Sequence, residues 1–261
     1  MLKIIKILAL GVAIATLTVT GAQSQDHDLK PTIVLVHGAF AESSSWDAVI
    51  TRLTKDGYVA IAAANPLRGV ASDAASVASV VRAIHGPVIL VGHSYGGPVI
   101  TEAANGSPNV KALVYVAGFM PDTGESSATL SGKFPGSTLA DTLAPVTLPD
   151  GKQDLYIQRS KFQLQFAADV PDDKAALMAS TQRPVAQAAL AEPSGVASWK
   201  LLPSYMIYGS SDRSIPPAVM QFMASRAHAV KTVVIDGASH AVPVSHPSEV
   251  AALIEEAASA Q

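Results

Sequence analysis

The clearest chemical pattern in the sequence is a single serine among glycines. Ser94 lies in the run Gly92-His93-Ser94-Tyr95-Gly96-Gly97, directly after an apolar, β-branched stretch over residues 88–91. Gly-x-Ser-x-Gly between a strand and a helix is typical of a nucleophile elbow, a sharp turn that holds its serine in a strained backbone conformation. Glycines are needed there because strand, turn and helix crowd together. The pattern predicts that Ser94 is a nucleophile at the positive N-terminus of a helix.

A serine nucleophile needs a base, and the base needs an orienting group. In chains with this elbow, the acid and then the histidine follow the serine. Among seven histidines, His240 lies in the loop directly after the predicted strand 231–235, so we expect it to be the base. His246, at the start of the last predicted helix, is the alternative, and its other possible role is to cap or pack that helix.

The acid is expected at the end of the strand that precedes the histidine strand. Asp212 follows the predicted strand 205–209 and is the expected acid. Asp122, which follows an earlier predicted strand, and Asp236, close to His240 in the chain, remain alternatives.

An oxyanion hole needs two preorganised backbone donors, and the loss of one donor costs about 3–4 kcal/mol. The residue after the nucleophile, Tyr95, is expected to supply one N–H group. The loop His37-Gly38-Ala39-Phe40, at the end of the first predicted strand, is expected to supply the other from Ala39, with Phe40 as the alternative. We expect His37 to brace this loop.

The elements that must position these residues alternate regularly between strand and helix. Strands are predicted over residues 32–36, 58–63, 88–91, 111–117, 205–209 and 231–235, and helices over 46–53, 72–84, 217–227 and 247–258, with another after the elbow. Short connections in this order predict an α/β fold with a doubly wound, mostly parallel sheet. Ligands bind at the carboxyl ends of such strands, where the candidate residues lie.

The regular alternation of strand and helix stops over residues 122–203, where glycine and proline mark several loops. Helical pieces are predicted at 153–166, 172–180 and 184–191, with no buried strand. We interpret residues 122–203 as a helical cap inserted into a core formed by residues 23–121 and 204–261. The predicted substrate contacts are Phe40, His93, Phe119 and Met120, while the cap residues Leu155, Tyr156, Phe162, Phe166 and Trp199 are more often cap core than ligand contacts.

The N-terminus resembles a secretory signal peptide over residues 1–22, with a basic start, an apolar stretch and small residues before Gln23. Cleavage before Gln23 is preferred, and a cut after Ser24 is the alternative. The apolar stretch is short for a bilayer, which needs about 20 residues. We therefore expect a periplasmic or secreted enzyme with no stable membrane anchor after cleavage.

Composition excludes several classes of protein. The chain has 261 residues, a net charge of −3 and no cysteine, so disulfides, thiolate metal sites and cysteine nucleophiles are excluded. The absence of a basic cluster argues against nucleic acid as a partner. No metal site is expected, and the oligomeric state is left open.

Taken together, these motifs resemble the α/β-hydrolase superfamily, in particular small serine carboxylesterases related to plant methyl-ester esterases and hydroxynitrile lyases. The resemblance covers the chain from about residue 31 onward except for the cap. It implies Ser94 as nucleophile, Asp212 as acid, His240 as base, Ala39 and Tyr95 as oxyanion donors, and no cofactor.

The expected function is hydrolysis of a small-molecule carboxylic ester, and two alternatives remain. One is a hydroxynitrile lyase or another carbon–carbon cleaving member, although the plant lyases carry a lysine after the histidine where this chain has Ala241. The other is a non-catalytic binding protein. No arginine or lysine is placed to receive a charged acyl group, which favours neutral esters of small to medium size.

Overall fold

The computed structural model describes residues 30–260, and the predicted signal peptide lies outside them. Its centre is a six-stranded sheet in the order β2-β1-β3-β4-β8-β9, in which every neighbouring pair is parallel. The strands are β1 (Thr32–Val36), β2 (Ala60–Ala63), β3 (Val88–His93), β4 (Val110–Val116), β8 (Ser204–Gly209) and β9 (Lys231–Ile235). The predicted fold class is therefore confirmed.

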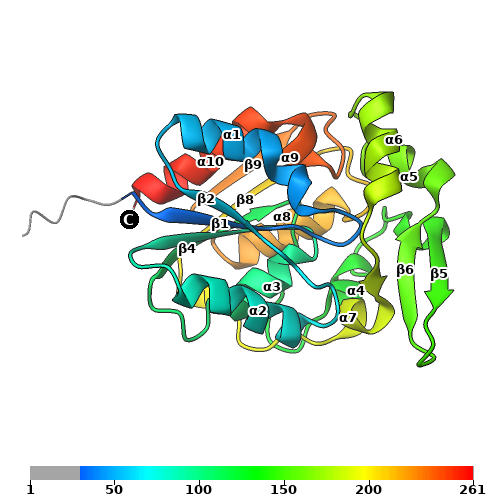
Figure 1. The fold of residues 1–261 in the computed structure, drawn as a ribbon, viewed down its shortest axis with the longest axis horizontal. Helices are drawn as coiled ribbons and strands as arrows, with labels where there is room; N and C mark the ends of the chain where they lie inside the picture. Colours follow the sequence, from blue (N-terminus) through cyan, green and yellow to red (C-terminus); the bar gives the residue numbers. More distant parts are fainter. Residues whose placement is uncertain (1–29, 261) are drawn as a thin grey trace, which may run out of the picture.

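The central strands are apolar runs because helices cover both faces of the sheet. Every residue of β3 and of β8 is buried. One face is covered by α1 and α10 and the other by α2 and α3 (Figure 1). The helices of the core are α1 (Asp47–Lys55), α2 (Val70–Arg82), α3 (Gly96–Ala103), α8 (Pro217–Arg226), the short α9 (Val242–Ser245) and α10 (Pro247–Ser259), and a 3₁₀ turn, η1 (Ser43–Trp46), precedes α1.

The strand order reverses beside β1, because the chain runs from β1 to β2 on one side and returns to β3 on the other. Such a reversal opens a crevice at the carboxyl ends of the strands, where ligands bind in open α/β sheets. The loop after β1 and the elbow after β3 meet at this point.

Residues 122–203 contain both helices and strands, so the prediction of helical pieces with no buried strand is wrong in part: the helix expected over 172–180 is present, but strands occur as well. The elements are α4 (Ser127–Ser131), β5 (Leu143–Thr147), β6 (Gln153–Ile157), α5 (Phe162–Phe166), α6 (Asp172–Thr181), β7 (Val185–Ala186) and α7 (Gln187–Ala191), with short 3₁₀ turns between them. The strands form a second, antiparallel sheet in the order β5-β6-β7. The predicted helix 153–166 is thus a strand followed by a short helix, because β6 pairs with partners on both sides that a local pattern does not reveal.

We refer to residues 122–203 as the cap, since β5, β6, α5 and α6 lie beyond the carboxyl ends of the core strands (Figure 1). Arg68 pairs with Asp154 of β6 at 2.6 Å. The Glu192 carboxylate accepts hydrogen bonds from the N–H groups of Val70 and Ala71 at the start of α2, at 2.9 and 3.1 Å. These bonds hold two separate parts of the cap on the core.

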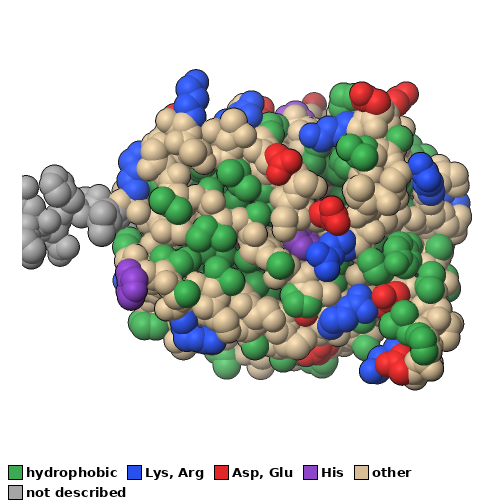
Figure 2. Space-filling model, viewed as in Figure 1, with side chains coloured by type: hydrophobic (Ala, Val, Ile, Leu, Met, Phe, Trp, Pro, Cys, Tyr) green, Lys and Arg blue, Asp and Glu red, His purple; other side chains and the backbone are tan. Residues whose placement is uncertain are grey.

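The surface carries charges of both signs. In the face shown in Figure 2, Lys and Arg side chains lie among Asp and Glu side chains and exposed apolar groups. Within residues 30–260, no helix is both long enough and apolar enough to cross a membrane.

Candidate active site

Ser94 occupies the strained turn that the sequence predicts. Its φ is +54°, in the left-handed region that side-chain-bearing residues rarely adopt. A Cβ atom at Gly92 would lie 2.6 Å from the carbonyl oxygen of Gly96, and one at Gly96 would lie 2.5 Å from that of Val36. The close backbone contacts require glycine at both positions, so the sequence holds Ser94 at the tip of the turn between β3 and α3.

Three side chains from three separate loops form a hydrogen-bonded chain. His240 Nε2 lies 2.9 Å from Ser94 Oγ, and His240 Nδ1 lies 2.6 Å from Asp212 Oδ2. The Asp212 carboxylate accepts a hydrogen bond from Nδ1–H, which leaves Nε2 free to accept a hydrogen bond from the serine hydroxyl. All three residues are buried. The structure thus brings together the predicted nucleophile, acid and base.

The remaining oxygen of the acid is also held. Asp212 Oδ1 accepts hydrogen bonds from the N–H groups of Ser214 and Ile215, at 2.7 and 2.9 Å. With both oxygens occupied, the Asp212 carboxylate has a fixed orientation toward His240.

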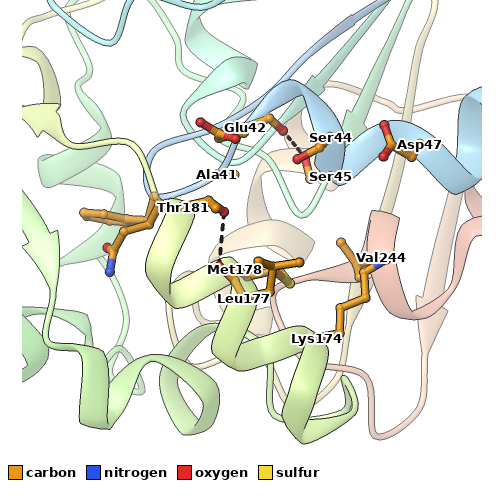
Figure 3. Close-up of a pocket in the computed structure, with 12 residues that line it drawn as sticks. Ala41, Glu42, Ser44, Ser45, Asp47, Lys174, Leu177, Met178, Thr181 and Val244 are labelled. Carbon is orange, nitrogen blue, oxygen red and sulfur yellow. Dashed lines mark hydrogen bonds between the residues drawn. The ribbon is translucent and has the colours of Figure 1, made fainter.

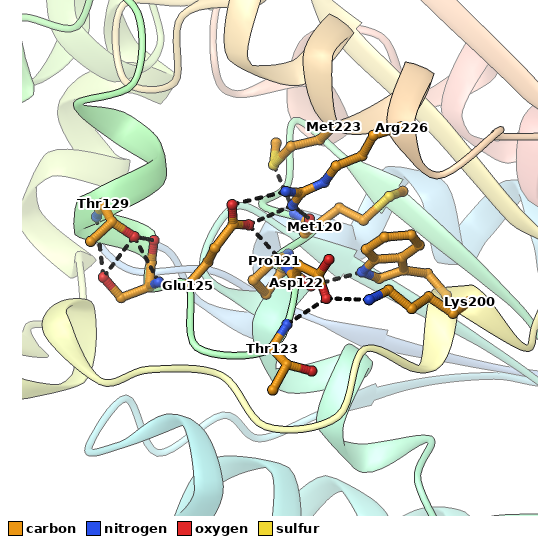
Figure 4. Close-up of polar contacts among 11 residues, drawn as sticks. Met120, Pro121, Asp122, Thr123, Glu125, Thr129, Lys200, Met223 and Arg226 are labelled. Carbon is orange, nitrogen blue, oxygen red and sulfur yellow. Dashed lines mark hydrogen bonds and ion pairs between the residues drawn. The ribbon is translucent and has the colours of Figure 1, made fainter.

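The alternative acids and base lie in other contacts. His246 Nε2 lies 3.3 Å from Asp169, and Asp236 accepts from Ser210 at 3.0 Å. Asp122 pairs with Lys200 at 2.5 Å, beside the ion pair of Glu125 with Arg226 (Figure 4). The hydrogen bond from Lys200 lowers the pKa of Asp122 below its usual value. None of these three alternatives hydrogen-bonds to the Ser94–His240–Asp212 chain.

Two backbone N–H groups near Ser94 are free to bind an oxyanion. Within residues 30–260, the N–H groups of Ala39 and Tyr95 donate to no protein acceptor, whereas the Phe40 N–H donates to the carbonyl of Arg183 at 3.0 Å. A Cβ atom at Gly38 would lie 2.6 Å from Ser94 Cβ, so this loop packs directly against the nucleophile. The geometry favours Ala39 over Phe40 as the second donor.

The Tyr95 side chain points away from these donors and anchors the elbow to α2. Its hydroxyl donates to Asp73 Oδ2 at 3.0 Å, and both residues are buried. Burial raises the pKa of Tyr95 and that of Asp73. Tyr95 is therefore placed to serve the site through its backbone.

His37 braces the oxyanion loop, as predicted. Its Nε2 accepts a hydrogen bond from the Asn65 N–H at 3.3 Å, so its proton lies on Nδ1, which is 3.0 Å from the Gly38 carbonyl oxygen. The Asn65 side-chain amide also donates to the His37 carbonyl at 2.8 Å. Burial lowers the pKa of His37 to about 4, which keeps the ring neutral. The sequence alone does not single out Asn65, which follows the predicted strand 58–63 and lies 28 positions from His37.

His93 was predicted as a substrate contact, but the structure encloses it in the protein. Its ring packs against Trp46, Phe166 and His240, with centroid distances of 6.3, 6.0 and 4.9 Å. His93 Nε2 lies 3.1 Å from the carbonyl oxygen of His240. Burial, followed by the neighbouring charge of His240, lowers the pKa of His93 well below its usual value. His93 therefore holds the backbone of the histidine loop.

Two cavities lie near the site. The first, which we call the α6 cleft, lies between α6 and the segment that leads into α1, and Figure 3 shows residues of α6 facing that segment and Val244. Phe40 lines this cleft. The second, the α4 cavity, has a volume of about 420 Å³ and is lined by Phe119, by residues of α4 and by apolar residues of the cap.

The other predicted substrate contacts divide between these cavities and the core. Phe119 donates its N–H to the Ser94 carbonyl at 3.2 Å and connects the α4 cavity to the elbow. Met120 is fully buried, its N–H contacts Met223 Sδ at 3.1 Å, and it lines neither cavity. Met120 thus packs in the core. In the part of the chain that the structure describes, no group of three or more His, Asp or Glu side chains could hold a metal ion.

Residues 33–253 match the alpha/beta hydrolase family. The chain belongs to this family. It is 26% identical over 254 residues to the alpha/beta hydrolase nvfD of Aspergillus novofumigatus, covering 88% of this chain and 97% of the relative. It is 28% identical over 158 residues to methylesterase 8 of Arabidopsis thaliana, covering 55% and 56% of the two chains.

A solved structure of this hydrolase fold is also similar. Polyneuridine aldehyde esterase has a TM-score of 0.76 at 20% identity and covers 87% of this chain and 98% of its own. At that identity the likeness shows the fold alone. This α/β-hydrolase fold therefore places the Ser94, Asp212 and His240 loops at one edge of the sheet, and its relatives support a hydrolase of the esterase type.

Proposed function

We propose that this hydrolase cleaves carboxylic esters through an acyl-enzyme on Ser94. The observation that carries the proposal is the continuous hydrogen-bonded chain from Ser94 through His240 to Asp212, next to two unused backbone N–H donors. A nucleophile, a base oriented by an acid, and two aligned donors are the parts that acyl transfer requires.

The first half-reaction forms the acyl-enzyme. Ser94 Oγ attacks the ester carbonyl carbon while His240 Nε2 takes the hydroxyl proton, and the N–H groups of Ala39 and Tyr95 stabilise the negative charge on the carbonyl oxygen. The tetrahedral intermediate collapses, the bond to the alcohol oxygen breaks, and His240 gives its proton to that oxygen. Asp212 stabilises the imidazolium that His240 becomes between taking the proton from Ser94 and giving it to the alcohol oxygen.

The second half-reaction releases the acid. A water molecule attacks the acyl carbon and loses its proton to His240. The bond to Ser94 Oγ then breaks, and His240 returns the proton to the serine. The products are a carboxylic acid and free enzyme, and no cofactor takes part in these steps.

The cavities suggest where the two halves of the ester bind. His240 must protonate the leaving oxygen, so the alcohol lies on the His240 side of Ser94, where Val244 of α9 lines the α6 cleft. The acyl group then points toward Phe119 and the α4 cavity. The α4 cavity has mostly apolar walls, with three serines and no charged lining residue, which supports neutral acyl groups of small to medium size.

The experiment is a panel of p-nitrophenyl esters of increasing acyl length, tested on the wild type and on Ser94→Ala. We expect turnover by the wild type and its loss, by at least about 10³-fold, in the variant. A fluorophosphonate probe should label Ser94 in the wild type only. Retained turnover in Ser94→Ala would exclude the mechanism, and cleavage of mandelonitrile without turnover of any ester would support a lyase instead.

Export to the periplasm or the medium is proposed from the sequence alone. Mass spectrometry of the protein from a periplasmic or extracellular fraction should find a mature N-terminus at Gln23. An intact Met1 on the active enzyme would contradict this proposal.

A further inference from the structure

One short segment of the cap contacts both of the loops that carry the acid and the base. We call residues 165–169 the clamp segment. At its first residue, the buried Gln165 side chain donates from Nε2 to the carbonyl oxygen of Arg213 at 2.9 Å. Ser214 Oγ donates to the Gln165 carbonyl at 3.4 Å, and the Ser214 N–H is one of the two donors to Asp212. The clamp segment therefore contacts the backbone that orients the acid.

The amide of Gln165 has a partner at each end. Its Oε1 accepts from Thr138 Oγ1 at 2.8 Å, while Nε2 binds the Arg213 carbonyl. Glutamine is rarely buried unless its polar groups are satisfied. The bond to Arg213 connects the cap to the acid loop, and the bond to Thr138, within the cap, fixes the orientation of the amide.

The other end of the clamp segment contacts the histidine loop. Asp169 accepts a short hydrogen bond from Ser239 Oγ, and Ser239 directly precedes His240. The Phe166 ring lies edge-on to the His240 ring, with centroids 4.9 Å apart. His246 lies 3.3 Å from the second oxygen of Asp169. The cap thus approaches His240 through both a polar and an aromatic contact.

We infer that Gln165 and Asp169 are positioning residues that hold Asp212 and His240 in the relative position that catalysis requires. The acid and base come from two different loops, and the core holds each of them separately, Asp212 by two N–H groups and His240 by His93. The clamp segment is a single piece of chain in contact with both loops, so it fixes their relative position. A misplacement of about 1 Å at such a site costs up to roughly 100-fold in rate. The inference rests on the proposed esterase function.

The test compares matched substitutions within the cap. Gln165→Met removes the bonds to Arg213 and Thr138, and Asp169→Ala removes the bond to Ser239. The control for the first is Gln163→Met on the same helix, because among residues 30–260 the Gln163 side chain bonds only to Val170 and Asp172 of the cap. The control for the second is Asp154→Ala, which breaks the ion pair with Arg68 but contacts neither catalytic loop.

We expect Gln165→Met and Asp169→Ala to lower kcat for p-nitrophenyl acetate by roughly 10- to 100-fold, with KM changed less than about twofold. The rate of fluorophosphonate labelling at Ser94 should fall in parallel, since it reports activation of the serine by His240. Asp169→Asn keeps an oxygen acceptor for Ser239 and should recover most of the loss.

Two outcomes would overturn the inference. If the control variants lose as much kcat as the test variants, the bonds of Gln165 and Asp169 serve only to hold the cap together. If kcat and the labelling rate are unchanged in folded Gln165→Met and Asp169→Ala, the two residues do not position Asp212 and His240. If Asp169→Ala does not fold, Ser239→Ala removes the same bond from the other end and must show the same loss. Labelling of the wild type at Ser94 separates these outcomes from failure of the esterase proposal.

Discussion

The Gly38 carbonyl oxygen lies 3.0 Å from His37 Nδ1, and this hydrogen bond sets the direction of the Ala39 N–H. The carbonyl of Gly38 and the N–H of Ala39 belong to one trans peptide, so they point in opposite directions. When His37 holds the carbonyl on one side, the N–H is presented on the other, beside Ser94. A neutral histidine thereby preorganises an oxyanion donor without contacting substrate.

Replacement of His37 by phenylalanine should lower kcat for p-nitrophenyl acetate by roughly 10- to 100-fold. The peptide would lose its orientation, and full loss of one oxyanion donor costs about 10²–10³-fold. Steady-state kinetics would measure the effect, with the exposed His85→Gln as control. An unchanged kcat in a folded His37→Phe protein would show that the loop orients its N–H without the imidazole.

The two buried neutral histidines should make the fold sensitive to acid. Burial lowers the pKa of His37 to about 4 and lowers that of His93 well below its usual value. Between pH 6.5 and about 4 the unfolded chain therefore binds protons that the folded protein does not. Each such histidine lowers the free energy of unfolding by about 1.4 kcal/mol per pH unit as the pH falls.

Urea unfolding at pH 7, 6, 5 and 4.5 would measure this effect. The loss of stability per pH unit should be smaller in His37→Phe than in the wild type, because one of the two groups has been removed. An identical slope in both proteins would contradict the low pKa of His37.

Local patterns were sufficient to predict the elbow, the strands of the core and the loops that carry Asp212 and His240. These features depend on residues that are close in sequence, such as the glycines around Ser94, whose close backbone contacts the structure shows. Strand β6 was mistaken for a helix because its pairing with β5 and β7 is a tertiary property. Local patterns could not predict the direction of the His93 side chain either, because its partner His240 is 147 positions away in the sequence.

Gly38 should not tolerate even one additional methyl group. A Cβ atom there would lie 2.6 Å from Ser94 Cβ and 2.7 Å from the His93 carbonyl oxygen, and neither group can move without distorting the elbow. Overpacking of this kind typically costs 1–3 kcal/mol. We expect Gly38→Ala to lower kcat by more than about 10-fold and to lower the Tm.

Gly195→Ala is the matched control, because Gly195 is exposed and its Cβ would come no closer than 3.5 Å to its nearest neighbour, Glu102 Oε1. Its kcat and Tm should equal those of the wild type. Wild-type activity in Gly38→Ala would mean that the oxyanion loop can shift away from Ser94 without loss of function.

Tyr95→Phe should separate the roles of the side chain and the backbone. The variant keeps the N–H group but removes the hydroxyl that donates to the buried carboxylate of Asp73. Asp73 also accepts from the backbone N–H groups of Arg68 and Gly69, so we expect a loss of about 1–2 kcal/mol in the free energy of unfolding. The kcat should stay within about twofold of the wild type, and a loss of more than about 10-fold would assign the hydroxyl a role in catalysis.

The α4 cavity should determine how kcat/KM depends on the length of the acyl chain. Ala128 of α4 lines it, and phenylalanine at this position would occupy part of its volume of about 420 Å³. If the acyl group binds there, Ala128→Phe should lower kcat/KM for p-nitrophenyl octanoate by roughly 10-fold or more and leave the acetate ester nearly unchanged, since each buried methylene contributes about 0.8 kcal/mol.

Leu177→Phe in the α6 cleft is the matched variant on the alcohol side, and it should leave the acyl-length series as in the wild type. The opposite pattern, with the series altered by Leu177→Phe and not by Ala128→Phe, would place the acyl group in the α6 cleft.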